Sequence, residues 1–372
     1  MNKPIFRSFT CAKSFLSKDL EIQLKPRVKP NLTAENLKFG QLSTDHMLTI
    51  EYKKNKGWSN PLIEPLRHFS LHPFNSTLHY SLTCFEGMKA YRGHNGELYL
   101  FRPMENMRRF LQSNLRLAFA PFEPEELLKC IVEYVKLEKD WIPEAKMSSL
   151  YLRPTAISSE DMLGVHKAHS NLIFLVASPV GSYFSGGIKL SVNEDYWRGT
   201  PHSASAFKLG SNYAPTVLIG EELAKRGYSQ AIWTYNEQLL ESGATNMFFV
   251  IKNKQGETEI VTHPTDGSIL PGITRDSIIQ LHSELFKHYK ISQRPFTITE
   301  FIDCYKENRL KEVFVTGTAS VIGKVDEIEM RGQIYKLSND DKNNEYSNKM
   351  KEYIVGIQHG EIKHPFSYPI LE

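Results

Sequence analysis

The chain has 372 residues, of which 41% are hydrophobic, so it carries enough apolar material for two packed domains of ordinary size. Its 45 basic and 42 acidic residues nearly balance, and a net charge of +3 gives no field that favours nucleic acid or a membrane surface. The longest apolar stretches, such as residues 171–180, are too short to span a bilayer. We therefore expect neither nucleic acid nor a membrane as a partner.

The N-terminal segment differs in composition from the rest of the chain. Residues 1–18 contain lysine, arginine and several hydroxyl side chains, and no acid occurs before Asp19. This composition is typical of a mitochondrial transit peptide, and a disordered basic start in a cytoplasmic protein is the alternative. Residues 20–38 show little periodicity, so we expect an extended arm and treat residues 1–38 as an N-terminal extension.

From residue 39 to 177 the pattern mixes short strands with helices. We expect strands at 48–52 and 98–101, and helices at 104–117 and 125–139. Residues 178–187 are rich in Gly, Ser and Pro, which predicts a loop, and their central position indicates a domain junction. Residues 39–177 are therefore predicted to form a smaller N-terminal α/β domain.

The second half has a different order of elements. We expect strands at 188–192, 230–234, 247–251 and 313–316, and helices at 214–226 and 274–289. Pro215 suits a first helical turn, and Gly227 is well placed to end that helix. No GxGxxG motif follows a strand, so a dinucleotide-binding fold is not supported. The prediction is a mixed α/β (α+β) chain, with a larger C-terminal mixed-sheet domain over 188–372.

The cysteines show neither a CxxC pair nor the spacing of metal ligands. This usage favours a reducing compartment and predicts no disulfide framework. The residues concerned are Cys11, Cys84, Cys130 and Cys304.

Two turns in the second half place a charged side chain where a regular element ends. Lys208 lies between an apolar residue and a small polar turn, which favours the neutral, nucleophilic amine, and Tyr213 is close enough to share a ligand. Glu241 precedes an apolar strand, where a carboxylate needs a cationic or protonated partner. An ordinary loop lysine and a turn or helix-cap acid are the alternatives.

Two further turns offer backbone N–H groups. Pro271 and Gly272 precede a helix, so the N–H groups of Ile273 and Thr274 form a natural phosphate cup. The turn at 316–319 follows a strand and is a second source of donors, although a plain turn explains it equally well. Together the turns supply a lysine, a carboxylate, a hydroxyl and a phosphate cup, which are the groups that pyridoxal phosphate requires.

At this point the sequence resembles the branched-chain amino-acid aminotransferases, the eukaryotic-style group of pyridoxal-phosphate enzymes with fold type IV. The resemblance runs from about Phe39 to the C-terminus. Its matching stretches are FG at 39–40, TDHMLT at 44–49, LHP at 71–73, LHY at 78–80, FEGMKA at 85–90, SLYLRPT at 149–155, LGV at 163–165, and the turns above.

The resemblance implies reversible transamination of leucine, isoleucine and valine with 2-oxoglutarate, by a ping-pong mechanism in a homodimer with a shared active site. The partners would be amino acids and 2-oxo acids. It implies that Lys208 binds the cofactor covalently and moves a proton, that Glu241 keeps the ring nitrogen protonated, and that Tyr213 bonds the ring oxygen. The other cofactor-binding residues that it implies are Arg109, Ile273, Thr274 and Thr318 at the phosphate and Arg198 behind the ring.

The resemblance also implies a substrate pocket. An aromatic wall would surround the branched side chain, backbone N–H groups of the 318–319 turn would receive the substrate carboxylate, and an arginine with a tyrosine would bind the side chain of glutamate. Part of the pocket would come from the neighbouring subunit, namely Tyr80, Leu163 and Val165. The full set is Phe39, Tyr80, Phe85, Tyr151, Arg153, Leu163, Val165 and Ala319.

Some positions depart from the family pattern. A stretch that is often Gly-rich before the lysine reads His202-Ser203-Ala204-Ser205-Ala206, and Ala244 replaces a threonine near the ring. Ser320 and Gly323 occupy the positions of a redox CxxC in mammalian members, which rules out a thiol switch at that place.

Other functions remain open from the residues alone. Within the same fold, the alternatives are a D-amino-acid aminotransferase, an aminodeoxychorismate lyase or a catalytically inert binding protein. A metal hydrolase would use His68, His72 and His79, although Pro73 interrupts their helical spacing and no carboxylate lies at a catalytic offset. We expect no metal.

Overall fold

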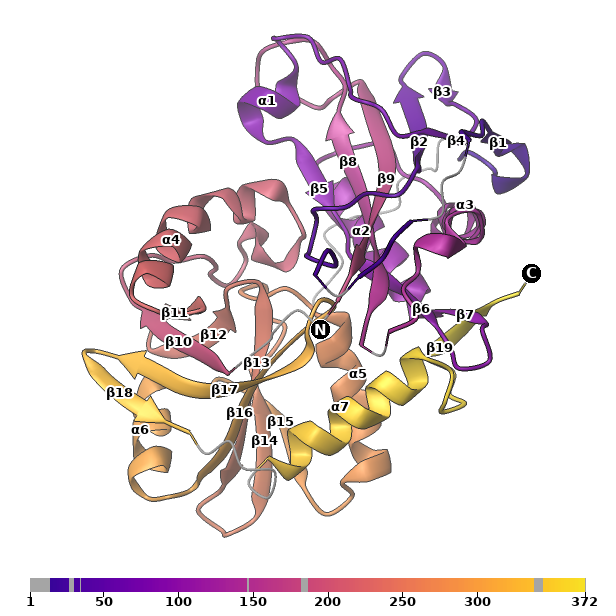
Figure 1. Ribbon diagram of the computed structural model, residues 1–372. Helices are drawn as coiled ribbons and strands as arrows, with labels where there is room; N and C mark the ends of the chain where they lie inside the picture. The colour runs from indigo at the N-terminus through magenta and orange to yellow at the C-terminus, as the bar shows by residue number, and fades with distance from the viewer. Residues whose placement is uncertain are drawn as a thin grey trace. The chain divides into compact units, whose positions relative to one another are not determined.

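The computed structural model describes residues 14–26, 30–33, 35–145, 147–181, 187–337 and 344–371. The chain divides into two compact units (Figure 1). Unit 1 runs to Gly181 and also contains Lys208–Ser211 and the C-terminal segment from Pro365, and the remaining residues form unit 2. The predicted boundaries at 38, 177 and 187 remain a prediction. The first three residues of the predicted 178–187 loop belong instead to a strand that ends at Val180, and residues 182–186 lie outside the described residues.

Unit 1 is built on a sheet with the strand order β1-β4-β2-β9-β8-β6-β7-β19, in which β3 pairs with β2 and β5 pairs with β8. The strands in chain order are β1 Glu21–Ile22, β2 His46–Lys53, β3 Gly57–Trp58, β4 Leu62–Pro65, β5 Thr83–Phe85, β6 Met88–Arg92, β7 Leu98–Phe101, β8 Ser149–Ser158, β9 Ser170–Val180 and β19 Ser367–Ile370. The last strand pairs with β7, which is why the C-terminal segment belongs to unit 1.

Helices α2, Pro103–Arg116, and α3, Pro124–Leu137, confirm the predicted helices to within two residues. Each begins at a proline, which fits the first turn of a helix because its nitrogen has no hydrogen to leave unpaired. Their buried positions recur three or four residues apart, so each helix packs one face inward. The other helical elements of unit 1 are α1 Ser76–Tyr80 and the 3-10 turns Ser17–Asp19 and Lys139–Trp141.

Two residues of the N-terminal extension, Phe15 and Ser17, are anchored in unit 1. The Phe15 ring is 4% exposed, and its centroid lies 5.3 Å from that of Trp58 and 6.2 Å from that of Phe122. The backbone N–H and the hydroxyl of Ser17 donate to Oε2 of Glu126 at 2.6 and 2.7 Å. Residues 1–13 of the expected transit peptide lie outside the described residues. Cleavage at about residue 18 would remove Phe15 and Ser17, and with them the contacts that they make in unit 1.

Unit 2 is a sheet with the order β12-β11-β10-β17-β16-β13-β14-β15, and an additional pairing of β12 with β13 closes part of it on itself. Buried side chains such as Leu190, Ile232 and Phe249 form its apolar core. The strands are β10 Ile188–Asn193, β11 Gln230–Tyr235, β12 Gln238–Ser242, β13 Thr245–Lys252, β14 Thr258–Thr262, β15 Lys290–Gln293, β16 Leu310–Gly317, β17 Val321–Met330 and β18 Gln333–Lys336.

The helices of unit 2 are α4 Val217–Lys225, α5 Ile273–Leu285, α6 Ile298–Lys306 and α7 Glu345–Gln358, and α7 runs beside α5 (Figure 1). The predicted helix at 214–226 is a 3-10 turn, Ala214–Thr216, followed by α4. The predicted helix at 274–289 ends earlier, at Leu285, because the chain leaves helical geometry at Phe286 and turns there.

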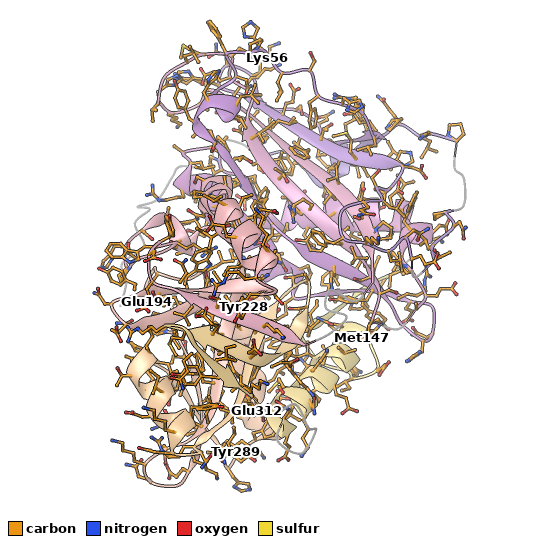
Figure 2. All side chains as sticks on the ribbon, turned by 60° about the vertical axis from the view of Figure 1, so that its left-hand side comes forward. Lys56, Met147, Glu194, Tyr228, Tyr289 and Glu312 are labelled. Atoms are coloured by element: carbon orange, nitrogen blue, oxygen red, sulfur yellow. The ribbon has the colours of Figure 1, made fainter. Side chains whose placement is uncertain are left out.

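A buried acid connects the sheet of unit 2 to α7. Glu312 on β16, labelled in Figure 2, is 4% exposed and accepts bonds of 2.9 Å from the backbone N–H groups of Tyr346 and Ser347. The carboxylate thus satisfies donors in the first turn of α7 that have no partner within the helix. With these elements in place, the predicted mixed α/β class in two parts is confirmed.

Candidate active site

The Lys208 segment is counted with unit 1 because its backbone is bound there. The Lys208 N–H donates to Oγ of Ser113 on α2 at 3.0 Å, and its carbonyl accepts from the N–H of Phe85 at 3.0 Å. Leu209 forms a β-bridge with Cys84. The amine Nζ lies 4.7 Å from the centroid of the Phe85 ring, so an aromatic face lies beside this half-buried side chain.

Aromatic rings and an arginine gather beside that lysine in unit 1. The rings of Phe39 and Tyr151 meet edge to face at 4.8 Å. The Arg153 guanidinium lies 4.6 Å from the Phe85 ring centroid and donates from Nη2 to the Tyr151 hydroxyl at 3.0 Å. A Cβ on Gly87 would lie 2.0 Å from that hydroxyl, so only glycine fits this close approach. The structure therefore brings the predicted aromatic wall and Arg153 together.

The structure also separates the two neighbouring arginines of α2. Arg109 is 11% exposed in its side chain and bonds the buried carboxylate of Glu86 through Nε at 2.8 Å and Nη2 at 2.6 Å. Arg108 is 58% exposed and pairs with Glu105 one turn earlier. Burial alone would raise the pKa of Glu86, but the Arg109 guanidinium and the nearby Lys208 amine hold that pKa below its ordinary value. Arg109 is thus the inward-facing arginine.

Glu241 lies on a tight hairpin of unit 2. Gly243 has a φ of +53°, which a tight turn requires, and the turn sets Glu241 opposite Asn246 on the next strand. The Glu241 carboxylate is 2% exposed and accepts from Nδ2 of Asn246 at 3.1 Å and from the N–H of Leu270 at 3.0 Å. Its other oxygen pairs with the Arg198 guanidinium. The cationic partner that a buried acid requires is therefore present in the same unit.

Tyr213 joins this group through the same arginine, because the Arg198 guanidinium lies 5.4 Å from the centroid of the Tyr213 ring. The sequence alone does not single out Asn246, yet its side-chain amide donates to both the Glu241 carboxylate and the carbonyl of Leu270. A two-residue turn at Gly243 and Ala244 would have predicted that Asn246 faces Glu241, because the length of such a turn fixes which residues pair across a hairpin.

The predicted phosphate cup lies beside that hairpin. Helix α5 begins at Ile273 after Gly272, which supplies no side-chain cap to the first N–H groups. A Cβ on Gly272 would lie 2.0 Å from Oδ1 of Asn246, so the helix start approaches the hairpin closely. The strand register runs from Glu241 through Asn246 to Thr316, which places the turn containing Thr318 and Ala319 at the same end of the sheet.

The residues present in unit 2 fit an anionic, phosphorylated ring. In the part of the chain that the structure describes, several buried polar atoms of this region have no hydrogen-bond partner, although buried polar groups are normally satisfied. They are Nε of Arg198, Oγ of Ser242, Oγ1 of Thr316 and Oγ of Ser320. Together with the carboxylate and the uncapped helix start, these donors and acceptors match the chemistry of pyridoxal phosphate.

Tyr80, Leu163 and Val165 form another group in unit 1. The Tyr80 hydroxyl accepts from the N–H of Gly164 at 2.9 Å, which joins α1 to the loop that follows β8. These side chains are 36%, 45% and 85% exposed, respectively. Their exposure contrasts with the buried Tyr151 and Glu86 of the other group.

Two of the three histidines considered for a metal site have ring nitrogens in contact with the backbone. Nδ1 of His72 accepts from the N–H of Phe74 at 3.1 Å, and a ring nitrogen of His79 lies 2.7 Å from the carbonyl of Pro73. No cluster of three or more metal-ligating side chains is found among the residues that the structure describes. None of the described helices is both long and apolar enough to cross a membrane.

Residues 83–328 match the family model described as amino-transferase class IV. The chain is 42% identical to the branched-chain-amino-acid aminotransferase of Dictyostelium discoideum over 337 residues, which cover 89% of each protein. It is 39% identical to the mitochondrial branched-chain-amino-acid aminotransferase of Schizosaccharomyces pombe, over 95% of this chain and 86% of the relative. Against the cytosolic enzyme of Rattus norvegicus the identity is 38%, over 94% and 86%.

Solved structures share the fold. The branched-chain aminotransferase of Thermoproteus uzoniensis with norvaline matches with a TM-score of 0.70 at 24% identity, over 88% of this chain and 100% of that chain. The branched-chain amino acid aminotransferase of Thermobaculum terrenum in its PLP-form matches with a TM-score of 0.68 at 18% identity, over 89% and 100%.

Proposed function

Since the chain belongs to the branched-chain-amino-acid aminotransferases, within the class IV amino-transferases, we propose that it transfers the amino group of leucine, isoleucine or valine to 2-oxoglutarate. The products are the branched-chain 2-oxo acids and glutamate, formed in two alternating half-reactions. The observation that carries this choice of substrates is the cluster in unit 1, where aromatic rings adjoin one arginine. An apolar wall suits a branched aliphatic side chain, and a cation at its edge suits the second carboxylate of glutamate.

Pyridoxal phosphate is the proposed cofactor, and when bound it supplies an electron sink that stabilises negative charge at the Cα of the amino acid. Lys208 offers Nζ for covalent attachment, and the same nitrogen accepts and returns the proton of that Cα. The Phe85 ring lies beside this amine and limits the directions in which it can move.

The remaining roles are divided among charges and backbone donors. Glu241 holds a positive charge on the ring nitrogen, and Arg198 and Asn246 keep its carboxylate in one orientation. Tyr213 bonds the ring oxygen. Arg109, the N–H groups of Ile273 and Thr274, and Thr318 hold the phosphate. The N–H groups of Thr318 and Ala319 receive the carboxylate of the substrate.

We also propose a homodimer in which Tyr80, Leu163 and Val165 contribute to the active site of the neighbouring subunit. The exposure of these side chains within one chain supports this proposal, because exposed apolar groups often mark protein contacts. Relatives occur as mitochondrial and cytosolic forms. The basic, acid-poor start of the chain supports a mitochondrial location, which remains a proposal.

A coupled assay of L-leucine with 2-oxoglutarate tests the proposed function. Glutamate should form, and the visible absorbance of the bound cofactor should disappear with leucine alone and return with 2-oxoglutarate. D-leucine and D-alanine serve as controls, because turnover of a D-amino acid in place of L-leucine would indicate the D-amino-acid enzyme of the same fold. Absence of any cofactor absorbance would contradict the proposal altogether.

A further inference from the structure

Three consecutive residues, the last of β5 and the two that follow it, contact different members of the predicted site in unit 1. The N–H of Phe85 binds the carbonyl of Lys208, and the Phe85 ring contacts both the Lys208 amine and the Arg153 guanidinium. Glu86 binds Arg109, and Gly87 makes room for the Tyr151 hydroxyl. A short segment therefore sets the relative positions of several side chains that come from distant parts of the sequence.

The carboxylate of Glu86 is the most confined group in this segment. It has no exposed surface and receives Nε and Nη2 of Arg109, Nδ2 of Asn106 at 3.3 Å and the N–H of Gly87 at 2.7 Å. Its own backbone N–H donates to the carbonyl of Pro154 on β8 at 2.8 Å. The acid therefore has little freedom to move, and a guanidinium bonded to it through two parallel bonds shares that restriction.

We propose that Glu86 is a positioning residue, which fixes the plane of the Arg109 guanidinium so that its outer donors point at the cofactor phosphate. This inference rests on the proposed function, in which Arg109 binds that phosphate. A guanidinium carries its N–H donors in one rigid plane, so an edge held by a carboxylate determines the direction of the others. Fixing the donor in advance also removes an entropic cost from phosphate binding.

Charge balance supports the same role. Without Glu86, the largely buried Arg109 guanidinium would lose the carboxylate that balances its charge, and breaking a buried ion pair is unfavourable. Glutamine has nearly the same shape as glutamate, but it carries no charge, and its NH₂ group meets an N–H of Arg109 where an oxygen now accepts a bond. The Glu86→Gln variant should therefore release the guanidinium from its fixed plane.

The test compares two ligands that differ only in the phosphate. The full-length apo protein is titrated with pyridoxal phosphate and with pyridoxal, and binding is followed by absorbance. In Glu86→Gln the dissociation constant for pyridoxal phosphate should rise about tenfold or more. The constant for pyridoxal should change less than about threefold, since pyridoxal has no group for Arg109 to hold. Glu105→Gln, which alters the exposed acid paired with Arg108, is the matched control and should change neither constant.

A second comparison guards against a variant that does not fold. The double variant Arg109→Met/Glu86→Gln should bind pyridoxal phosphate at least as well as Arg109→Met, because Glu86 acts through Arg109 and has nothing left to position. Equal weakening of both ligands in Glu86→Gln, or a further loss in the double variant, would overturn this role for Glu86. If the wild-type protein bound neither ligand, the proposed function itself would fail.

Discussion

Each unit contains a buried arginine–glutamate pair, and the two pairs have opposite proposed roles. The pair of unit 1 is held by two bonds, from Nε and Nη2 of the arginine, whereas the pair of unit 2 is held by one, from Nη1. In unit 1, Arg109 is the proposed ligand of the cofactor and Glu86 supports it. In unit 2, Glu241 is the proposed ligand and Arg198 supports it. Removing one partner of such a pair leaves a buried charge, which typically costs about 3–5 kcal/mol. In each pair, then, the side chain with the proposed contact to the cofactor is accompanied by an opposite charge that holds it in one orientation.

The largest loss of turnover is expected from a substitution of Lys208, and substitutions in the two arginine–glutamate pairs should cause smaller losses. Lys208→Ala should lower turnover by far more than about 100-fold, since it removes both the covalent attachment and the proton transfer. The measurement is the leucine assay together with borohydride reduction and mapping of the modified lysine. Lys89 is the rival, because burial lowers its pKa to about 8. Labelling of Lys89 in the wild-type protein would reject the assignment to Lys208.

Exchange of the acid in each pair should separate the two roles. Glu241→Gln should keep the cofactor bound and lower kcat by about tenfold or more, because a neutral amide does not hold the ring nitrogen protonated. Glu86→Gln should instead weaken cofactor binding, with less effect on kcat once the cofactor is saturating. The two variants are compared by cofactor titration and by kcat at saturating cofactor. Turnover at the wild-type rate in Glu241→Gln would contradict the proposed role of Glu241 at the ring nitrogen, and with it the proposed difference between the two acids.

Arg153 differs from the arginines of the two pairs, because its described contacts are with aromatic rings and a hydroxyl and not with a carboxylate. It lies over Phe85 and bonds a neutral hydroxyl, so its charge is available to a substrate carboxylate. Arg153→Met should raise KM for glutamate and 2-oxoglutarate about tenfold or more, because a charge-assisted contact contributes roughly 1.5–3 kcal/mol. The leucine half-reaction, measured in single turnover, should change less than about threefold. Equal damage to both half-reactions would indicate a structural arginine.

Local patterns in the sequence predicted much of this arrangement, and distant pairings limited the rest. The apolar run at 98–101 coincides with β7. The turn that the sequence suggests around Glu241 is shorter than expected, because Glu241 lies in β12 and the next strand begins at Thr245. Strands β8 and β9 are not identified individually from the sequence. In β9 the residues from Leu172 to Ala177 are all apolar, so the sequence lacks the polar alternation that identifies a strand. The Glu86–Arg109 pair joins residues 23 positions apart, and nothing local distinguishes this acid from an ordinary turn acid.

The smallest effect is expected from thiol oxidants, and here too the units differ. Unit 2 has Ser320 and Gly323 where mammalian relatives are expected to carry a thiol pair, whereas unit 1 has Cys84 next to the segment that contacts Lys208 and Arg109. Burial raises the pKa of the Cys84 thiol well above its ordinary value, with a further contribution from the charge of Glu86. Burial likewise raises the pKa of Cys130 to about 12.

Since the thiolate is the form that peroxide attacks, these thiols should react slowly at neutral pH. Mild peroxide should therefore change the leucine activity by less than about twofold, while a relative with the thiol pair serves as the positive control. Cys84→Ser tests the one thiol that adjoins the site, and it should behave like the wild type in this assay. The opposite result would be strong inactivation that a reductant reverses and that is absent in Cys84→Ser. That result would show that the Cys84 thiol is accessible in solution, which contradicts its burial in unit 1.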